Sequence, residues 1–174
     1  DAAALDAFLS TELPPPEARM ARRWLAHPAA VVWVAGSSPG RVDGVTISID
    51  LSRIDEEMLA ADPVVSRLVE ALARVAPPIP GRTRLLARYH AKRGGMFEVM
   101  GGVANALQMS EWFQWLTTPG LQLSALNVPR PEYWAAMMSY FGFSALPDGE
   151  FDVAGERHGT YWREWRDQSP RDAA

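Results

Sequence analysis

Runs and alternations of apolar residues predict most of the secondary structure of this chain. Residues 29–35, AAVVWVA, form a continuous apolar run rich in Val, which is typical of a buried strand. In the segment 45–51, VTISIDL, apolar and polar residues alternate, so Val45, Ile47 and Ile49 share one face. Because a short turn, GSSPGRVDG, joins the two segments, we expect an antiparallel hairpin.

Apolar stripes with helical spacing predict the helices. Asp62 and Pro63 are favoured at the start of a helix, and apolar residues from Val64 to Val75 then form a stripe on one face. Ser52 together with Asp55 is expected to cap a shorter helix. Helices are expected at 2–10, 17–27, 52–61, 62–75, 102–116 and 131–141, and further strands at 84–90, 121–128, 150–154 and 159–165.

Composition excludes several classes of protein and site. The 174 residues predict one domain, 1–174, that buries about 70% of the surface of its unfolded chain. The formal net charge of −4 gives no electrostatic case for binding nucleic acid. Cysteine is absent, which excludes disulfides, thiolate zinc sites and a cysteine nucleophile. No segment reaches the roughly 18 consecutive apolar residues of a membrane span.

The chain begins with Asp1 rather than Met, so we expect a processed or excised piece of a longer protein. The absence of cysteine does not decide the compartment. A cytoplasmic location is our expectation for such a domain.

The segment from Leu121 to Phe143, LQLSALNVPRPEYWAAMMSYFGF, predicts a strand, a break bounded by proline, a helix and a closing Gly-Phe pair. This order resembles the late strand and following helix of the Gcn5-related N-acetyltransferase (GNAT) superfamily. The resemblance implies an α+β fold, with a central mixed, mostly antiparallel twisted sheet flanked by helices and a helical insertion at 52–76. The first strand of the family is either lost here or lies within residues 1–15.

A second segment, 99–104 or VMGGVA, resembles the loop with which GNAT enzymes bind the pyrophosphate of acyl-CoA. Small residues let backbone N–H groups approach phosphates, and the following helix N-terminus adds about half a positive charge. The resemblance implies that Gly101, Gly102, Val103 and Ala104 bind acetyl-CoA or another acyl-CoA. Val99 departs from the usual Gln or Arg. The alternative is a turn or helix entry without a ligand.

The resemblance also implies catalytic roles. The acyl-CoA would lie between the strands predicted at 84–90 and 121–128, which splay apart in this fold. A backbone N–H near Tyr89 would polarise the acyl carbonyl.

His90 or Glu98 would then accept the proton of the amine, and Tyr140 is the candidate acid. For His90, the alternative is a partly exposed histidine at the end of a strand.

Two positions depart from the pattern of active GNAT enzymes. Met138 stands where the family keeps a Tyr that protonates the leaving thiolate, and a thioether has no proton to donate. Pro131 replaces the Asn that usually opens the helix. These departures favour an alternative function, a catalytically inactive GNAT-like module that senses a ligand or docks a protein. A third alternative is an unrelated α+β binding domain, in which the two central strands would not splay.

The tail, GTYWREWRDQSP, resembles the ending of GNAT-like domains that are fused to larger actinobacterial ATPase or regulatory proteins, with Glu164 in place of Asp. This resemblance implies fused domains or a protein partner, in addition to the small-molecule acyl-CoA.

Two further patterns have simpler interpretations. Residues 36–40, GSSPG, match the nucleophile elbow G-x-S-x-G, but an alternating strand follows instead of a helix, so we expect an ordinary turn. His27, His90 and His158 are far apart in the sequence, which predicts no metal site.

Two surfaces are also predicted from residue patterns. The basic residues between Arg82 and Arg93 could meet cofactor phosphates or form the solvated face of an edge strand, and we expect the second. On the helix at 102–116, Met109, Phe113 and Leu116 have core spacing. Trp112 and Trp115 lie partly off that stripe and could line a pocket or an interface.

Overall fold

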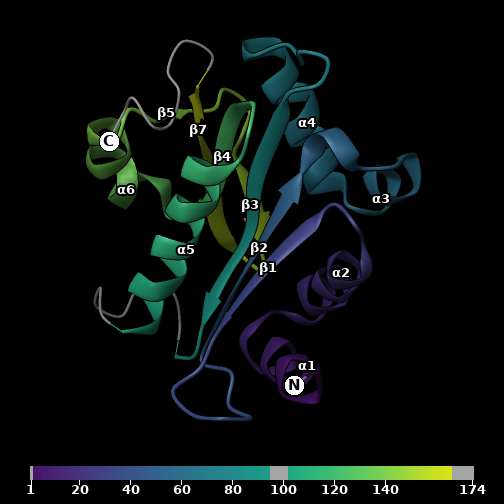
Figure 1. The fold of residues 1–174 in the computed structure, drawn as a ribbon, viewed down its shortest axis with the longest axis vertical. Coiled ribbons are helices and arrows are strands. Elements are labelled where there is room, and N and C mark those ends of the chain that lie inside the picture. Colours follow the sequence, from purple (N-terminus) through teal and green to yellow (C-terminus); the bar gives the residue numbers. More distant parts are fainter. Residues whose placement is uncertain (1, 95–101, 166–174) are drawn as a thin grey trace.

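The computed structural model describes residues 2–94 and 102–165, and within these residues seven strands form one mixed sheet (Figure 1). The strand order is β1-β2-β3-β4-β7-β5, and β6 pairs with β7. Neighbouring strands are antiparallel except for β3 and β4, which are parallel. The strands are β1 (Ala30–Ala35), β2 (Gly44–Asp50), β3 (Thr83–Lys92), β4 (Leu121–Pro129), β5 (Ser144–Ala145), β6 (Phe151–Val153) and β7 (Glu156–Glu164).

Helices cover both faces of the sheet. Figure 1 shows α5 and α6 on one side of the strands and α1 to α4 on the other. Adjacent residues of a strand point to opposite faces, so Leu86 joins the core beneath α1 to α4 while Leu85 joins the core beneath α5 and α6. The helices are α1 (Ala2–Glu12), α2 (Pro15–Ala26), α3 (Glu56–Ala61), α4 (Pro63–Val75), α5 (Val103–Thr117) and α6 (Pro131–Tyr140), with a 3₁₀ turn η1 (Leu51–Arg53).

The predicted α+β fold is confirmed, and so are the hairpin of β1 and β2 and the turn at 36–40. The helix expected at 52–61 is instead two pieces, because Asp50 accepts a hydrogen bond from the N–H of Ser52 in η1 and Asp55 caps α3 separately. No strand lies within residues 2–15, where α1 occupies the chain through Glu12.

The expectation of a solvated edge strand for the basic run is wrong. β3 lies between β2 and β4 in the interior of the sheet, and Arg84 and Arg88 on this strand are buried. The residue type of charged side chains predicts a surface position, but pairing on both sides places this strand in the core.

The face assigned to the helix at 102–116 is also wrong. In α5, Met109 is 65% exposed and Phe113 is 60% exposed, whereas Leu107, Glu111 and Trp115 face the sheet. The buried face therefore includes the carboxylate of Glu111, and a charged residue made this face look exposed in the sequence. Trp112 and Trp115 do line a small pocket between α5 and α6, as one alternative predicted.

Gly44 on β2 allows the first turns of α5 to pack directly on the sheet. A Cβ at this position would lie 2.8 Å from Val103 Cγ1 and 2.7 Å from Leu107 Cδ1. Gly44 also pairs with Lys92, so the N-terminus of α5 is held beside the end of β3.

We expect Gly44→Ala to lower the free energy of unfolding by about 1–3 kcal/mol, because the added methyl group overpacks this contact. Urea denaturation of the variant and of Gly44→Ala/Leu107→Ala measures the effect. The second substitution removes the contact with Leu107 Cδ1 and leaves the one with Val103 Cγ1, so the two changes should cost less together than the sum of their separate costs. Strictly additive costs would show that the contact is not tight.

Candidate active site

The parallel pair β3 and β4 separates part-way along its length. Pairing runs from Thr83 opposite Leu121 to Ala87 opposite Leu126, and none continues between the described residues beyond that point. β3 nevertheless extends to Lys92, and β4 extends to Pro129 while pairing with β7 on its other side. The splay expected for these strands is therefore present, and β3 has a free edge where it faces the gap.

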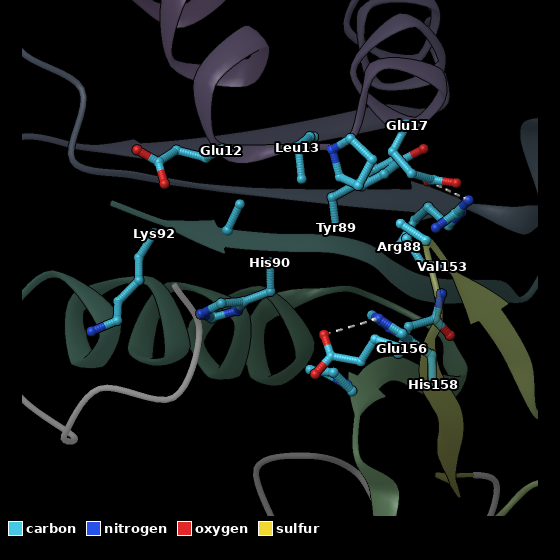
Figure 2. Close-up of a pocket in the computed structure, with 15 residues that line it drawn as sticks. Glu12, Leu13, Glu17, Arg88, Tyr89, His90, Lys92, Val153, Glu156 and His158 are labelled. Atoms are coloured by element: carbon cyan, nitrogen blue, oxygen red, sulfur yellow. Dashed lines mark hydrogen bonds and ion pairs between the residues drawn. The ribbon is translucent and has the colours of Figure 1, made fainter. Parts of the chain in front are cut away.

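A cavity of about 420 Å³ occupies this gap. The connection between α1 and α2 forms one wall, β3 from Arg88 to Lys92 forms the floor, and the end of β4 with the β6–β7 hairpin forms the other wall. Figure 2 shows His90 and Lys92 on the α5 side of β3, and Glu12 and Leu13 on the opposite side. Because residues from both faces line it, the cavity reaches past the free edge of β3.

A β-bulge decides which side chains of β3 face each way. Ile47 of β2 pairs with Tyr89 and the next residue, Ser48, pairs with Ala87, so Arg88 is the extra residue. The guanidinium of Arg88 contacts Glu17 of α2, and Tyr89 belongs to the same core beneath α1 to α4. Alternation then resumes with His90 directed at α5. Bulges of this kind often re-aim side chains beside active sites.

Arg88 is held in a buried ionic network on the α2 side of the cavity. Its Nη2 lies 3.0 Å from Glu17 Oε2, its Nε lies 3.2 Å from Asp62 Oδ2, and its Cζ is 4.4 Å from the centre of the Tyr89 ring. Burial lowers the pKa of Arg88, but the charges around it outweigh burial and raise the pKa overall. Burial raises the pKa of Tyr89, so its phenol remains protonated. On this side of the cavity, β3 therefore presents a fixed cation, Arg88, and no side chain that could accept a proton.

His90 and Lys92 are the titratable residues of β3 on the α5 side, and His90 lies against a carboxylate of α5. Its Nδ1 lies 3.5 Å from Glu111 Oε1 of α5 and 3.4 Å from Thr46 Oγ1 of β2. Burial alone lowers the pKa of His90, but the hydrogen bonding and charge of Glu111 prevail, so the pKa is raised. The second histidine of the cavity, His158, stacks on Phe151 and has a pKa lowered chiefly by burial.

Comparisons with known proteins agree with this geometry. No protein-family profile and no curated protein sequence matches the chain. Among solved structures, FeeM, an N-acyl amino acid synthase from uncultured soil microbes, is 15% identical with a TM-score of 0.60, over 96% of this chain and 94% of FeeM. Arabidopsis thaliana NAA60, solved with a bisubstrate analogue, is 12% identical with a TM-score of 0.54, over 84% of this chain and 82% of NAA60. Both are GNAT-type structures. The chain has the GNAT fold.

Within the GNAT fold, the structure places several of the residues predicted from the sequence. His90 and Tyr89 both line the cavity, one on each face of β3. Gly102 is the N-cap of α5, with a φ of 58° and no side-chain cap, and Val103 and Ala104 follow in the first turn. The α5 N-terminus thus lies beside the end of β3, where the GNAT resemblance puts the pyrophosphate. Glu98 and Gly101 lie outside the described residues.

The predicted acid, Tyr140, lies elsewhere. It is near the end of α6 and 86% exposed, and it does not line the cavity formed by the described residues. Met138 is buried in the core beneath α6. This side of the GNAT fold therefore offers the cavity no hydroxyl from either position.

Sequence reasoning missed several residues of the cavity or its support. Glu111 was not recognised because it lies among the aromatic residues of α5. Asn127 and Glu156 line the cavity from β4 and β7, and the hydroxyl of Thr160 lies 2.8 Å from Asn127 Oδ1. Asn127 follows Leu126, the last residue of β4 that pairs with β3, and a polar residue within this largely apolar strand was the one usable signal in the sequence. The described residues contain no group of three or more His, Cys, Asp or Glu that could hold a metal ion.

No helix in the described part of the chain is long and apolar enough to cross a membrane.

Proposed function

We propose that this protein is an N-acyltransferase that transfers an acyl group from acyl-CoA to an amine. The observation that carries the proposal is the open gap between β3 and β4, with His90 on its floor and the N-terminus of α5 packed beside the end of β3. The GNAT fold supports the proposal, since FeeM is an N-acyl amino acid synthase and NAA60 was solved with a bisubstrate analogue.

Each part of the gap suits one step of this reaction. The N–H groups of the first turn of α5, together with Gly101 and Gly102, would bind the pyrophosphate, because a helix N-terminus attracts anions. Beyond Ala87, no strand pairs with β3 at the gap among the described residues, so a backbone N–H near Tyr89 would polarise the thioester carbonyl.

The amine nitrogen would then attack the carbonyl carbon directly. The C–N bond forms, the C–S bond breaks, and His90 takes the proton that leaves the nitrogen. A thiolate is a stable leaving group because thiols have a pKa of about 8.5, so solvent can protonate it without a dedicated acid. The role suggested for Tyr140 remains a prediction that this reaction does not require.

Binding of acetyl-CoA, measured by calorimetric titration, is the direct test. We expect a micromolar Kd, about −8 kcal/mol, in the unmodified protein. Gly102→Glu should weaken binding about tenfold or more, because its carboxylate would lie near the pyrophosphate. Gly81→Glu is the matched control. Gly81 and Gly102 both have positive φ, 76° and 58°, and a Cβ added at either would meet no atom within 4 Å beyond its chain neighbours. Both substitutions should therefore cause similar backbone strain.

Equal affinities in the two variants would show that the α5 N-terminus does not bind the pyrophosphate. No heat with acetyl-CoA, free CoA or a longer acyl-CoA at millimolar concentration would overturn the proposal. That result would favour the inactive GNAT-like module that senses another ligand or docks a protein.

A further inference from the structure

Glu111 is a carboxylate in an unfavourable place. It lies on the sheet-facing side of α5 between Leu107 and Trp115 and is only 3% exposed. A buried carboxylate costs several kcal/mol unless it is paired, and a leucine would fill such a position at no electrostatic cost. Fold stability therefore does not explain this residue.

The one ion pair of Glu111 with a described residue is the contact with His90, at 3.5 Å between Oε1 and Nδ1. Glu111 also lines the small pocket between α5 and α6, whereas His90 lines the cavity of the gap. His90 and Glu111 thus lie between the gap and this small pocket, near the point where β3 and β4 separate. Any reaction in the gap would take place beside this pair.

The contact decides which imidazole nitrogen can act as a base. The buried Oε1 of Glu111 has no hydrogen-bond partner among the described residues, and its negative charge 3.5 Å from Nδ1 favours the tautomer with the proton on Nδ1 and the lone pair on Nε2. The ring is also held against Thr46 of β2, which limits its rotation. A histidine fixed by a carboxylate on one nitrogen is oriented for proton transfer on the other.

We propose that Glu111 is a positioning residue, which orients His90 so that Nε2 accepts the proton of the acceptor amine. This inference rests on the proposed function. In the reaction, the proton moves from the amine nitrogen to Nε2, and the negative charge of Glu111 stabilises the imidazolium ion that forms. The proton then passes to solvent when product leaves.

Other charged groups near His90 are placed differently. Lys92 follows two residues later on the same face of β3, and Glu156 and His158 line the opposite wall from β7. Glu156 lies 4.0 Å from His158 rather than against His90. From α5, Glu111 faces the imidazole directly, and it accounts for the raised pKa of His90.

NMR titration of the three histidines tests the pairing without any substrate. In Glu111→Gln, we expect the pKa of His90 to fall by about one pH unit or more, because the neighbouring negative charge is lost. The matched control is Glu156→Gln, which should lower the pKa of His158 and leave that of His90 unchanged. An unchanged His90 titration in folded Glu111→Gln protein would overturn the proposal.

Kinetics separate positioning from a structural role. Glu111→Gln should lower kcat at least about tenfold and move the acidic limb of the pH–rate profile to lower pH, with little change in KM for acyl-CoA. His90→Gln/Glu111→Gln should be no slower than His90→Gln alone, because the two residues act as one unit. Additive losses would contradict the proposal.

Glu111→Leu provides a further control for folding. We expect this variant to keep or gain stability, since an apolar residue replaces a buried charge, while losing kcat like Glu111→Gln. Full activity in Glu111→Leu would overturn the proposal. Failure of the proposed function has a different signature: His90 would still respond to Glu111→Gln by NMR, but the unmodified protein would transfer no acyl group to any amine.

Discussion

Asp62→Ala should lower the free energy of unfolding by about 3–5 kcal/mol, since it removes one partner of a buried ion pair. Asp62 is 1% exposed, and its Oδ2 accepts hydrogen bonds from Trp24 Nε1 at 2.9 Å and Arg88 Nε at 3.2 Å. Its Oδ1 accepts from the backbone N–H groups of Val64 and Val65 at the start of α4. One carboxylate therefore joins α2, β3 and α4.

The cost comes mainly from Arg88 rather than from the helix cap. Without Asp62, the buried guanidinium retains Glu17 as its remaining carboxylate partner among the described residues, and the indole N–H of Trp24 loses its acceptor. Loss of an N-cap side chain alone costs about 1 kcal/mol. The larger part of the effect is the uncompensated charge and the unsatisfied donor.

Asp55→Ala is the matched control in urea or thermal unfolding. Asp55 is also an N-cap aspartate, accepting from the N–H of Met58 at 2.8 Å, but its side chain is 62% exposed. We expect a cost of about 1 kcal/mol for this variant. Equal costs for the two variants would show that the network around Arg88 adds nothing beyond the cap.

The fold could be predicted largely because local signals agreed with the final packing. Asp62 and Pro63 open α4 as their residue types suggest, and the alternating segment 45–51 forms a strand paired with β1, as predicted. The alternation did not predict that the polar residues Thr46 and Ser48 of β2 would be buried as well. Local patterns failed where a polar residue is buried for a tertiary reason. Arg84 and Arg88 led to the prediction of an edge strand, although they are buried in a central one. The charge of Glu111 likewise made the buried face of α5 look exposed in the sequence.

The candidate site could be predicted only in part, for the same reason. His90 and Tyr89 were accessible from the sequence because the GNAT resemblance locates the strand that carries them. Glu111 and Glu156 join the site through the packing of α5 and the pairing of β7 with β4, which depend on contacts between distant segments. A pattern within one segment does not encode such contacts.

His90→Gln should lower kcat for acyl transfer by about 10²- to 10⁴-fold, the usual contribution of a general base. The amine must lose a proton as the C–N bond forms. Two histidines line the cavity, and the pKa of His90 is raised by the buried carboxylate of Glu111, whereas the pKa of His158 is lowered, chiefly by burial. Glutamine keeps the polarity and nearly the size of the ring, but it cannot accept a proton in this pH range.

The pH dependence of the rate should show that His90 acts in its neutral form. Because Glu111 raises the pKa of His90 above its ordinary value of about 6.5, the proposed acyl transfer by the unmodified protein should slow as pH falls through that raised pKa, where the imidazole becomes protonated. This acidic limb should disappear in His90→Gln. His27→Gln, which changes a histidine paired with Asp55 outside the cavity, should retain both the limb and the rate.

The sequence also predicts Glu98 as a candidate base, and a result that favours Glu98 would contradict the role proposed for His90. If Glu98→Gln abolished the acidic limb and His90→Gln left it intact, the proton would go to Glu98, and the His90–Glu111 pair would have no part in the transfer. If His90→Gln alone abolished the limb, the base would be the histidine at the point where β3 and β4 part. The position of the limb also separates the two: an ordinary glutamate titrates near pH 4.3, about two pH units below an ordinary histidine, so a limb above pH 6.5 favours His90.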